Sequence, residues 1–418
     1  MIMHRSALLR AFRALRWSGP AVLLTLGLAT GCDDEGLDIP PVVRCDADAT
    51  PVFLASRLDD DDGDGRFSDE DYPRINDEDD DIADHAWIRG RDGLFHLFFH
   101  TENLGSGCHI EHYTSVDLCS LDYVGRALEA NPSGWDSYSL WAPHVVEADG
   151  VYYMFYSGVT GSGGDPETVQ RIGVAVSSDL YSWTRAPINR CPDTTGDGCA
   201  YECREPWTAW DESPGSYNQQ CRDPFVMWDP VGARWVMFAT AKSTNGYGVV
   251  TVATSDDLLE WRGTGFIDAT RRLPDGTGAQ ATGGMAENPH IMSHDGVHYL
   301  LFTDWRDPQS WYNVPAPRTM VQYATASTLD ADSSGSGNWT YRGYTPDPGV
   351  NAIEVLRVSL NRWIMSQSIS GPRSGAPQHR RHLRLRCVEW KGDYEFGTVN
   401  LVRPCDAAPG SSRPLDVP

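Results

Sequence analysis

The sequence predicts an all-β fold, a five-bladed β-propeller with four antiparallel strands in each blade. Three observations lead to this fold class. One phrase recurs five times along the chain, a second phrase follows several of its copies, and no long segment has the periodicity of a helix. A parallel sheet would need crossover connections, usually helices, and the sequence indicates none. The composition agrees, because 40 Gly and 27 Pro in 418 residues indicate many turns.

The recurring phrase consists of a short strand, a turn that often contains Asp-Gly, and an aromatic-rich strand. This pattern is typical of a β-hairpin. Five copies align without a gap, over residues 84–98, 141–155, 223–237, 287–301 and 351–365. Repetition at intervals of several tens of residues is the signature of a repeat architecture.

A second phrase supplies the third and fourth strands of a blade. It is found at residues 114–125, 176–187, 254–265 and, more loosely, 326–343. Four strands per repeat and five repeats make a five-bladed propeller. Equivalent positions of successive hairpins lie 57, 82, 64 and 64 residues apart. The long step contains a Cys-rich insertion, residues 188–220, which we expect to form one wall of the site. The final strands are expected within residues 382–392 and 395–402.

The N-terminal segment, residues 1–31, is predicted to be a signal peptide. It combines four arginines with an apolar run at residues 21–28 that is too short to span a bilayer. The run ends in Ala-Thr-Gly-Cys, which resembles a bacterial lipobox with Cys32 as the lipidated residue. An ordinary secretory signal is the alternative. The sequence therefore predicts an exported protein, either a bacterial cell-envelope lipoprotein that meets the membrane only through its lipid anchor, or a secreted protein.

The net charge argues against one class of partner. The chain has 58 acidic and 34 basic side chains, giving a formal charge of −24. Nucleic-acid binding needs clustered Lys and Arg, so no nucleic-acid partner is expected. We expect a monomer.

Residues 32–79 are predicted to be an acidic linker before a propeller domain at residues 80–405, and residues 406–418 a polar tail. Residues 60–71 of the linker match the spacing of an EF-hand-type calcium loop, with Gly65 at its sharp turn. The predicted ligands are carboxylates at loop positions 1, 3, 5 and 12: Asp60, Asp62, Asp64 and Asp71. A solvated acidic run is the alternative. The loop therefore predicts a structural calcium ion, whereas catalysis is expected to need no cofactor.

Export to an oxidising compartment predicts disulfides. Setting Cys32 aside leaves nine of the ten cysteines, so at most four pairs form. The short-range pairs Cys108–Cys119 and Cys387–Cys405 are expected. The four cysteines from Cys191 to Cys221 are expected to staple the insertion, since their spacing matches no common zinc finger.

The gapless alignment places carboxylates at equivalent positions. The first residues of the five copies are Asp84, Trp141, Asp223, Glu287 and Asn351. In a propeller these positions would form a ring at the mouth of the central funnel. Convergent carboxylates repel one another, so stability alone does not favour them, whereas a catalytic centre tolerates such conflict. The alternative is that each acidic residue merely caps a turn.

Two carboxyl groups on either side of a glycosidic bond, one protonated and one ionised, are the minimal machinery for glycoside hydrolysis. Aromatic side chains that could stack on sugar rings are Trp87, Trp141, Trp305 and Trp311. Among these, Trp141 is the best candidate because it shares the ring position with the carboxylates.

Four short motifs occur in the order expected of one enzyme group. They are Ala83-Asp84, Trp141-Ala142-Pro143-His144, Arg222-Asp223-Pro224 and Glu287-Asn288-Pro289. With them, residues 80–402 resemble the five-bladed propeller glycoside hydrolases of family 43 and the related family 32.

The resemblance implies a role for each carboxylate. Asp84 resembles the general base of inverting family 43 enzymes, or the nucleophile of retaining family 32 enzymes. Asp223 resembles the aspartate that stabilises the transition state and modulates pKa, and Glu287 resembles the general acid. Arg222 would bind a substrate hydroxyl or keep Asp223 ionised. Further candidates for substrate contacts are Trp141, His144, His290 and Trp305; the two histidines are alternatively part of a central ion site.

The leading prediction is therefore an exported glycosidase that cleaves furanosides or xylosides of arabinan- or xylan-type glycans with inversion. Its partner would be an oligo- or polysaccharide. Three alternatives remain: a retaining β-fructosidase acting on sucrose, levan or inulin, a non-catalytic carbohydrate-binding propeller, and a phosphorylase of a related propeller family.

Overall fold

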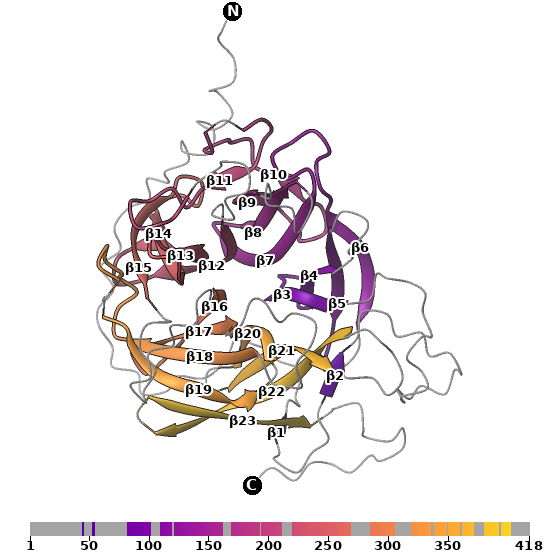
Figure 1. The fold of residues 1–418 in the computed structure, drawn as a ribbon. Coiled ribbons are helices and arrows are strands. Elements are labelled where there is room, and N and C mark those ends of the chain that lie inside the picture. Colours follow the sequence, from indigo (N-terminus) through magenta and orange to yellow (C-terminus); the bar gives the residue numbers. More distant parts are fainter. Residues whose placement is uncertain are drawn as a thin grey trace, which may run out of the picture. The chain divides into compact units, whose positions relative to one another are not determined.

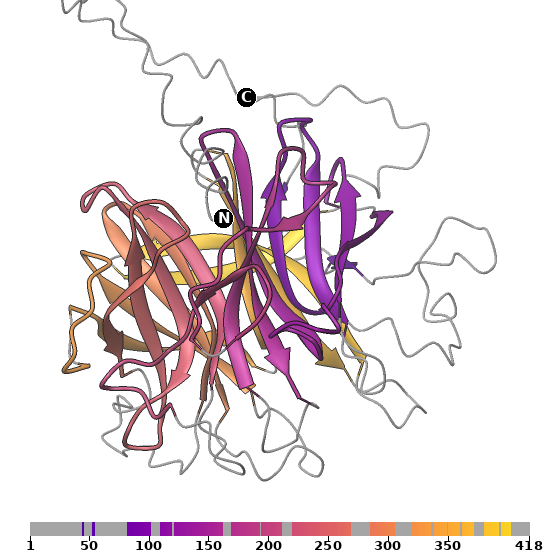
Figure 2. The same cartoon turned by 90° about the horizontal axis from the view of Figure 1, so that it is seen from above.

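Five antiparallel sheets surround a central axis in the computed structural model, as the sequence predicts (Figure 1). Figure 2 shows the same sheets after a turn of 90°. The structure describes residues 44–45, 52–54, 82–101, 109–118, 121–161, 169–192, 194–210, 220–268, 285–305, 319–335, 338–348, 350–359, 362–371, 380–392 and 394–402. The signal peptide, Cys32, the calcium loop at residues 60–71 and the polar tail lie outside these residues. No helix in the described part of the chain has the length and apolar character needed to span a membrane.

The strands follow one another from the axis outward in each blade. Blade one consists of β3 (Ile82–Arg89), β4 (Phe95–Thr101), β5 (Ile110–Ser115) and β6 (Asp122–Leu128). Blade two consists of β7 (Ser139–Ala148), β8 (Val151–Thr160), β9 (Val169–Ser177) and β10 (Thr184–Arg185), and the short β11 (Cys199–Tyr201) also pairs with β9. Blade three consists of β12 (Cys221–Asp229), β13 (Arg234–Lys242), β14 (Gly248–Ser255) and β15 (Arg262–Ile267).

The last two blades repeat this order. Blade four consists of β16 (Met285–His294), β17 (Val297–Trp305), β18 (Thr319–Ala326) and β19 (Thr340–Pro348). Blade five consists of β20 (Val350–Ser359), β21 (Arg362–Gly371), β22 (Arg380–Gly392) and β23 (Glu395–Val402). The innermost strands β3, β7, β12, β16 and β20 each contact the next, and β20 contacts β3, which closes the ring.

The hydrophobic core lies between the blades. Five clusters of buried apolar side chains are present among the described residues, one at each junction of neighbouring blades. At the junction of blades one and five, for example, Trp87 and Phe99 pack with Ile364 and Leu383. Each blade therefore buries both faces of its sheet, and the aromatic-rich second strands predicted from the sequence supply much of this apolar surface.

Two short strands from the N-terminal part of the chain complete blade five. Backbone pairing joins β1 (Arg44–Cys45) to β23 and β2 (Val52–Leu54) to β22. The sheet of the last blade thus contains strands from both ends of the described chain. These strands precede the propeller boundary predicted at residue 80.

The second sequence phrase forms the turn between the third and fourth strands. In blade two, the Ser177 hydroxyl accepts hydrogen bonds from the N–H groups of Asp179 and Leu180, at 3.1 and 2.9 Å. The indole N–H of Trp183 then donates to the Leu180 carbonyl at 2.8 Å. Leu180 is buried although its φ is 71°, a left-handed value that this local hydrogen bonding maintains. Blade three repeats the arrangement around Ser255 and Leu258.

Each innermost strand contains a β-bulge near its start. Two consecutive residues of the inner strand face one residue of the second strand in every blade. The bulged pairs are Ala83-Asp84, Ala142-Pro143, Asp223-Pro224, Asn288-Pro289 and Ala352-Ile353. The first residue of the pair has a left-handed φ in four blades, at 44° for Ala142, 54° for Asp223, 52° for Asn288 and 27° for Ala352. A bulge redirects side chains, so this irregularity determines what faces the axis.

The bulges show that the gapless sequence alignment is wrong in two copies. Relative to the bulge, it is displaced by two residues in copy one and by one residue in copy three. The cause is turn length: five residues separate Arg89 from Phe95, and four separate Asp229 from Arg234, but only two separate Ala148 from Val151. The three carboxylates therefore occupy successive positions around the bulge, not one ring position.

Two disulfides stabilise the insertion after blade two, as predicted. Cys191 pairs with Cys199, and Cys203 pairs with Cys221. Cys387 is also disulfide-bonded, but its predicted partner, like the predicted pair of Cys108 and Cys119, lies outside the described residues.

Removal of β1 and β2 tests their part in closing the propeller. A chain that begins at residue 57 should unfold at a temperature several degrees lower than a chain that begins at residue 43, because the outer edge of β22 and β23 loses its backbone partners. Differential scanning calorimetry of the two chains measures this difference. Equal midpoints would show that β1 and β2 contribute nothing to closure.

Candidate active site

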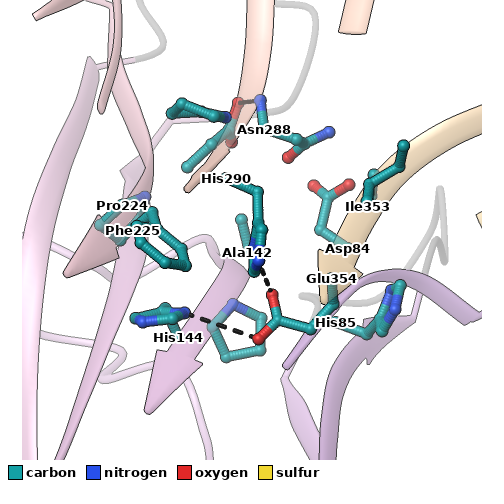
Figure 3. Close-up of a pocket in the computed structure, with 14 residues that line it drawn as sticks. Asp84, His85, Ala142, His144, Pro224, Phe225, Asn288, His290, Ile353 and Glu354 are labelled. Carbon is teal, nitrogen blue, oxygen red and sulfur yellow. Dashed lines mark hydrogen bonds and ion pairs between the residues drawn. The ribbon is translucent and has the colours of Figure 1, made fainter. Parts of the chain in front are cut away.

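The bulges bring three carboxylates from three blades to one end of the central funnel. Asp84 is the second residue of its bulge, Asp223 is the first, and Glu287 immediately precedes its bulge. Asp84, Asp223 and Asn288 line one small cavity of about 30 Å³ at the axis (Figure 3). Glu287 is joined to this group through Arg222. The structure thus brings together the three carboxylates predicted from the sequence.

Arg222 connects two of the carboxylates. Its Nη2 lies 2.5 Å from Oε1 of Glu287, and its Nε lies 3.4 Å from Oδ2 of Asp223. The remaining Nη1 donates to the side-chain oxygens of Gln170 and Gln220, at 3.2 and 3.3 Å. Although burial opposes the charge, Glu287 and Asp223 raise the pKa of Arg222 above its ordinary value. A buried, permanently charged guanidinium therefore lies between two acids.

The pKa of Asp223 is raised to about 6, because its burial penalises the carboxylate. Arg222 opposes this shift, whereas the nearby charge of Glu287 adds to it. Oδ2 of Asp223 accepts hydrogen bonds from the hydroxyl of Thr240 at 2.9 Å and the N–H of Asn288 at 3.2 Å. Near neutral pH the Asp223 carboxyl is therefore mainly ionised, and its Oδ2 has three partners: the Thr240 hydroxyl, the Asn288 N–H and Arg222.

Asp84 lies beside an imidazole. Its side chain is 17% exposed, and its Oδ2 is 4.0 Å from Nδ1 of His100. That nitrogen accepts the N–H of Ala142 at 3.2 Å, so it carries no proton. The His100 ring also lies near Trp141, with 6.5 Å between ring centroids. Asp84 and the half-buried Trp141 are thus neighbours of the same histidine.

A second ring of side chains lies one residue beyond the bulges, deeper in the funnel. It consists of His85, His144, Phe225, His290 and Glu354. Glu354 lies 3.0 Å from Nδ1 of His290 and 3.9 Å from Nδ1 of His144 (Figure 3). Burial opposes its ionisation, but these histidines lower the pKa of Glu354 below its ordinary value. Burial lowers the pKa of His85 to about 4, so that imidazole is neutral.

The ring does not form a metal centre in this structure. No group of three or more His, Cys, Asp and Glu side chains is arranged to hold a metal ion within the described residues. Nε2 of His144 donates to the Val226 carbonyl at 2.9 Å, and Nε2 of His290 accepts the N–H of Val355 at 3.0 Å. His144 and His290, two of the predicted substrate contacts, line the same cavity as Asp84 but lie one layer deeper in the funnel.

The tryptophans proposed as sugar platforms have different positions. Trp87 is 4% exposed and donates its indole N–H to Ser366 at 3.2 Å in the core, so its predicted stacking role is wrong. Trp305 ends β17 with its backbone paired to Met285, and its side chain, like all of Trp311, lies outside the described residues. Trp141 is the sugar-stacking candidate that the described site retains.

Four polar residues of this site are not predicted from the sequence. His100, Ser157 and Thr240 lie on the second strands of three blades, and Gln170 lies on β9. The hydroxyl of Ser157 accepts the N–H of Asp223 at 2.8 Å, which fixes the backbone of the bulge. A signal existed only for His100, because it is a histidine near the end of the strand that pairs with the strand of Asp84.

A five-bladed propeller with an arginine-linked carboxylate group at one end of its axis has the architecture of a glycosidase. The model of the glycosyl hydrolases family 43 matches residues 79–395, and the chain belongs to this family.

Curated and solved proteins extend the comparison. The chain is 27% identical over 215 residues to a sucrose-6-phosphate hydrolase of Bacillus subtilis. The matched region covers 50% of this chain and 38% of that protein. The chain therefore spans well under half of that relative's length.

Two examples among the solved structures that match have the same fold. The structure of a sucrose-6-phosphate hydrolase from Lactobacillus gasseri matches with a TM-score of 0.58 and 15% identity, over 77% of this chain and 61% of that one. An endo-1,4-beta-xylanase from Bacteroides thetaiotaomicron matches with a TM-score of 0.52 and 18% identity, over 77% and 97%.

Replacement of Thr240 by valine tests the electrostatics of Asp223. Thr240→Val removes a hydrogen bond to the carboxylate, so the pKa of Asp223 should rise further above about 6. A hydrogen bond to a charged group contributes about 1.5–3 kcal/mol, and one pKa unit equals about 1.4 kcal/mol. The acidic limb of the pH profile of kcat/KM should therefore move upward by about one unit.

The matched control is Thr251→Val, which changes a buried threonine on β14 of the same blade. Its pH profile should equal that of the wild type. An unmoved acidic limb in Thr240→Val would show that Asp223 ionisation does not control the rate.

Proposed function

We propose that the protein hydrolyses furanosides or xylosides in arabinan- or xylan-type glycans by single displacement, with inversion at the anomeric carbon. Asp84 activates the water as general base, Glu287 protonates the leaving oxygen, and Asp223 stabilises positive charge at the sugar ring. The observation that carries this proposal is the difference between the three environments. Asp84 lies beside a neutral histidine, Asp223 is buried, and Glu287 is paired with a guanidinium.

Membership of family 43 supports the reaction class. The choice of furanosides or xylosides rests further on the Trp-Ala-Pro motif at Trp141, and the xylanase of Bacteroides thetaiotaomicron is a solved neighbour with this fold.

Arg222 has a specific consequence for the acid. Its Nη2 contacts Oε1 of Glu287. A substrate hydroxyl that accepts a hydrogen bond from Arg222 would therefore meet the same guanidinium that pairs with the proposed acid, so Arg222 connects substrate binding to the position of Glu287.

The roles of the two carboxylates predict different responses to the leaving group. Glu287→Gln should reduce kcat on a natural glycoside at least about 10³-fold, within the usual range for loss of a general acid, but much less on a dinitrophenyl glycoside. Such a leaving group departs without protonation. Asp84→Asn should inactivate the enzyme on both substrates. Initial rates on the two glycosides measure the contrast.

Asp149→Asn is a suitable control because Asp149 lies in a hairpin turn with a φ of 50°, which asparagine tolerates. It should have wild-type rates on both glycosides. If Glu287→Gln lost the same factor on both substrates, Glu287 would not be the acid.

The stereochemical outcome separates the two glycosidase mechanisms. Proton NMR of the first product formed should show the anomer opposite to that of the substrate, since Asp84 is proposed to activate water and not to attack the sugar. Retained configuration would assign Asp84 as the nucleophile instead.

A retaining β-fructosidase is the second candidate function. It is favoured by the similarity to the sucrose-6-phosphate hydrolase of Bacillus subtilis and by the Arg222-Asp223-Pro224 motif. A panel of arabinofuranosides, xylosides, arabinan, xylan, sucrose and inulin distinguishes the two. Release of pentose supports the first candidate, and release of fructose alone supports the second.

Export is part of the proposal. Two disulfides in one insertion fit an oxidising compartment and so support export. The signal peptide and the lipidation of Cys32 remain predictions. The calcium loop at residues 60–71 and the monomeric state remain predictions.

A further inference from the structure

A second, larger pocket lies between the outer parts of blades one and two. It has a volume of about 520 Å³, within the range of small-molecule sites. Its lining comes from the end of β6, the loop that follows it, β10 and the disulfide-closed segment between Cys191 and Cys199. None of its lining residues belongs to the carboxylate site described above.

The walls of this pocket are held in place by buried contacts. Asp136 is fully buried and accepts hydrogen bonds from Arg185 at 2.8 Å and from the hydroxyl of Tyr156 at 3.0 Å. The indole N–H of Trp135 donates to the carbonyl of Asp197 at 3.1 Å, which ties the disulfide loop to the loop after β6. The pocket is therefore formed before any ligand arrives.

The lining combines the groups that recognise sugars. Trp183 offers a half-buried aromatic surface, while Asn131, Thr184 and Asp197 add an amide, a hydroxyl and an exposed carboxylate. The Asn131 oxygen already accepts the N–H of Ser133, so its NH₂ group is the part left for a ligand. Sugar hydroxyls both donate and accept hydrogen bonds. The Asp197 carboxylate can accept from such a hydroxyl, and the Asn131 NH₂ group can donate to one.

The charges exclude an anionic ligand. Arg185 is the basic residue of the lining, and it is paired with Asp136 and donates to the carbonyl of Glu129 at 2.6 Å. The carboxylate of Asp197 would repel a phosphate or an acidic peptide. A neutral, hydroxyl-rich ligand fits this combination.

We propose that this pocket is a secondary carbohydrate-binding site that holds a sugar unit of a polysaccharide while the carboxylate site acts elsewhere on the chain. Because strands alternate in direction, β6 ends on the face of the propeller where β3 and β7 begin. Trp183 and Thr184, by contrast, follow the turn after β9, which lies at the opposite face. The pocket therefore lies on the outer wall of the propeller, between its two faces. The inference concerns binding, and it stands independently of the catalytic roles of Asp84 and Glu287.

Affinity gel electrophoresis of the full chain tests the proposal. All proteins carry Glu287→Gln to prevent hydrolysis, and the gels contain soluble arabinan, xylan or levan. At least one polysaccharide should retard the parent protein, and Asn131→Ala with Asp197→Ala should weaken the apparent affinity at least fivefold. The exposed Asp256→Ala in blade three is the matched control and should bind like the parent.

A second measurement separates this site from the active site. In the chain with intact Glu287, the double variant should keep the kcat and KM of the wild type on a small chromogenic glycoside. Trp183→Ala is less suitable, because the indole packs against Phe98 and bonds the Leu180 carbonyl. Unretarded parent protein on all three gels, or equal retardation of the double variant, would overturn the proposal. If the double variant showed weakened retardation but the chain with intact Glu287 cleaved no glycoside, the proposed function would be wrong and the secondary binding site would stand.

Discussion

The site of this protein depends on one backbone constraint, the β-bulge at the start of every innermost strand. The bulge places two residues opposite one and gives the first of them a left-handed conformation in four blades. Proline is the second bulged residue in three blades, where no ladder hydrogen bond needs its missing N–H. Because each blade fills the three positions around the bulge differently, one repeated geometry supplies Asp84, Asp223 and Glu287 from three directions.

Arg222 makes this concentration of negative charge compatible with a folded protein. It precedes Asp223 directly and contacts Glu287 in the next blade, so one guanidinium serves two acids. Its position depends in turn on its neighbours. The Cys203–Cys221 disulfide fixes the preceding residue, and Gln170 and Gln220 accept its remaining N–H donors. The Cys-rich insertion therefore reaches the site through Cys221 and Gln220, while its first disulfide loop lines the peripheral pocket.

The sequence predicted the fold, the five hairpins and the three carboxylates, since hairpins and turn residues are local signals. It did not predict the relative positions of the carboxylates. A gapless alignment cannot register the longer turns between Arg89 and Phe95 or between Asp229 and Arg234, and each extra turn residue shifts every side chain before it. Gln170 and Thr240 carried no signal, because their role arises only when separate strands meet. The strands β1 and β2 were missed for a similar reason: short segments outside the repeat acquire meaning only from their partners.

The pairing of Val52 with Leu385 also has a consequence for the order of events during folding. The two residues lie at opposite ends of the described chain, so the closing sheet adds contacts of very long sequence separation to its local hairpins. Such topologies fold slowly, because the loop entropy must be lost before the contact forms. Blade five cannot be completed until almost the whole chain is available, and the ring cannot close with any earlier blade missing. The first four blades can form one after another as hairpin units. The complete ring, by contrast, closes only when strands from both ends of the described chain are paired in blade five.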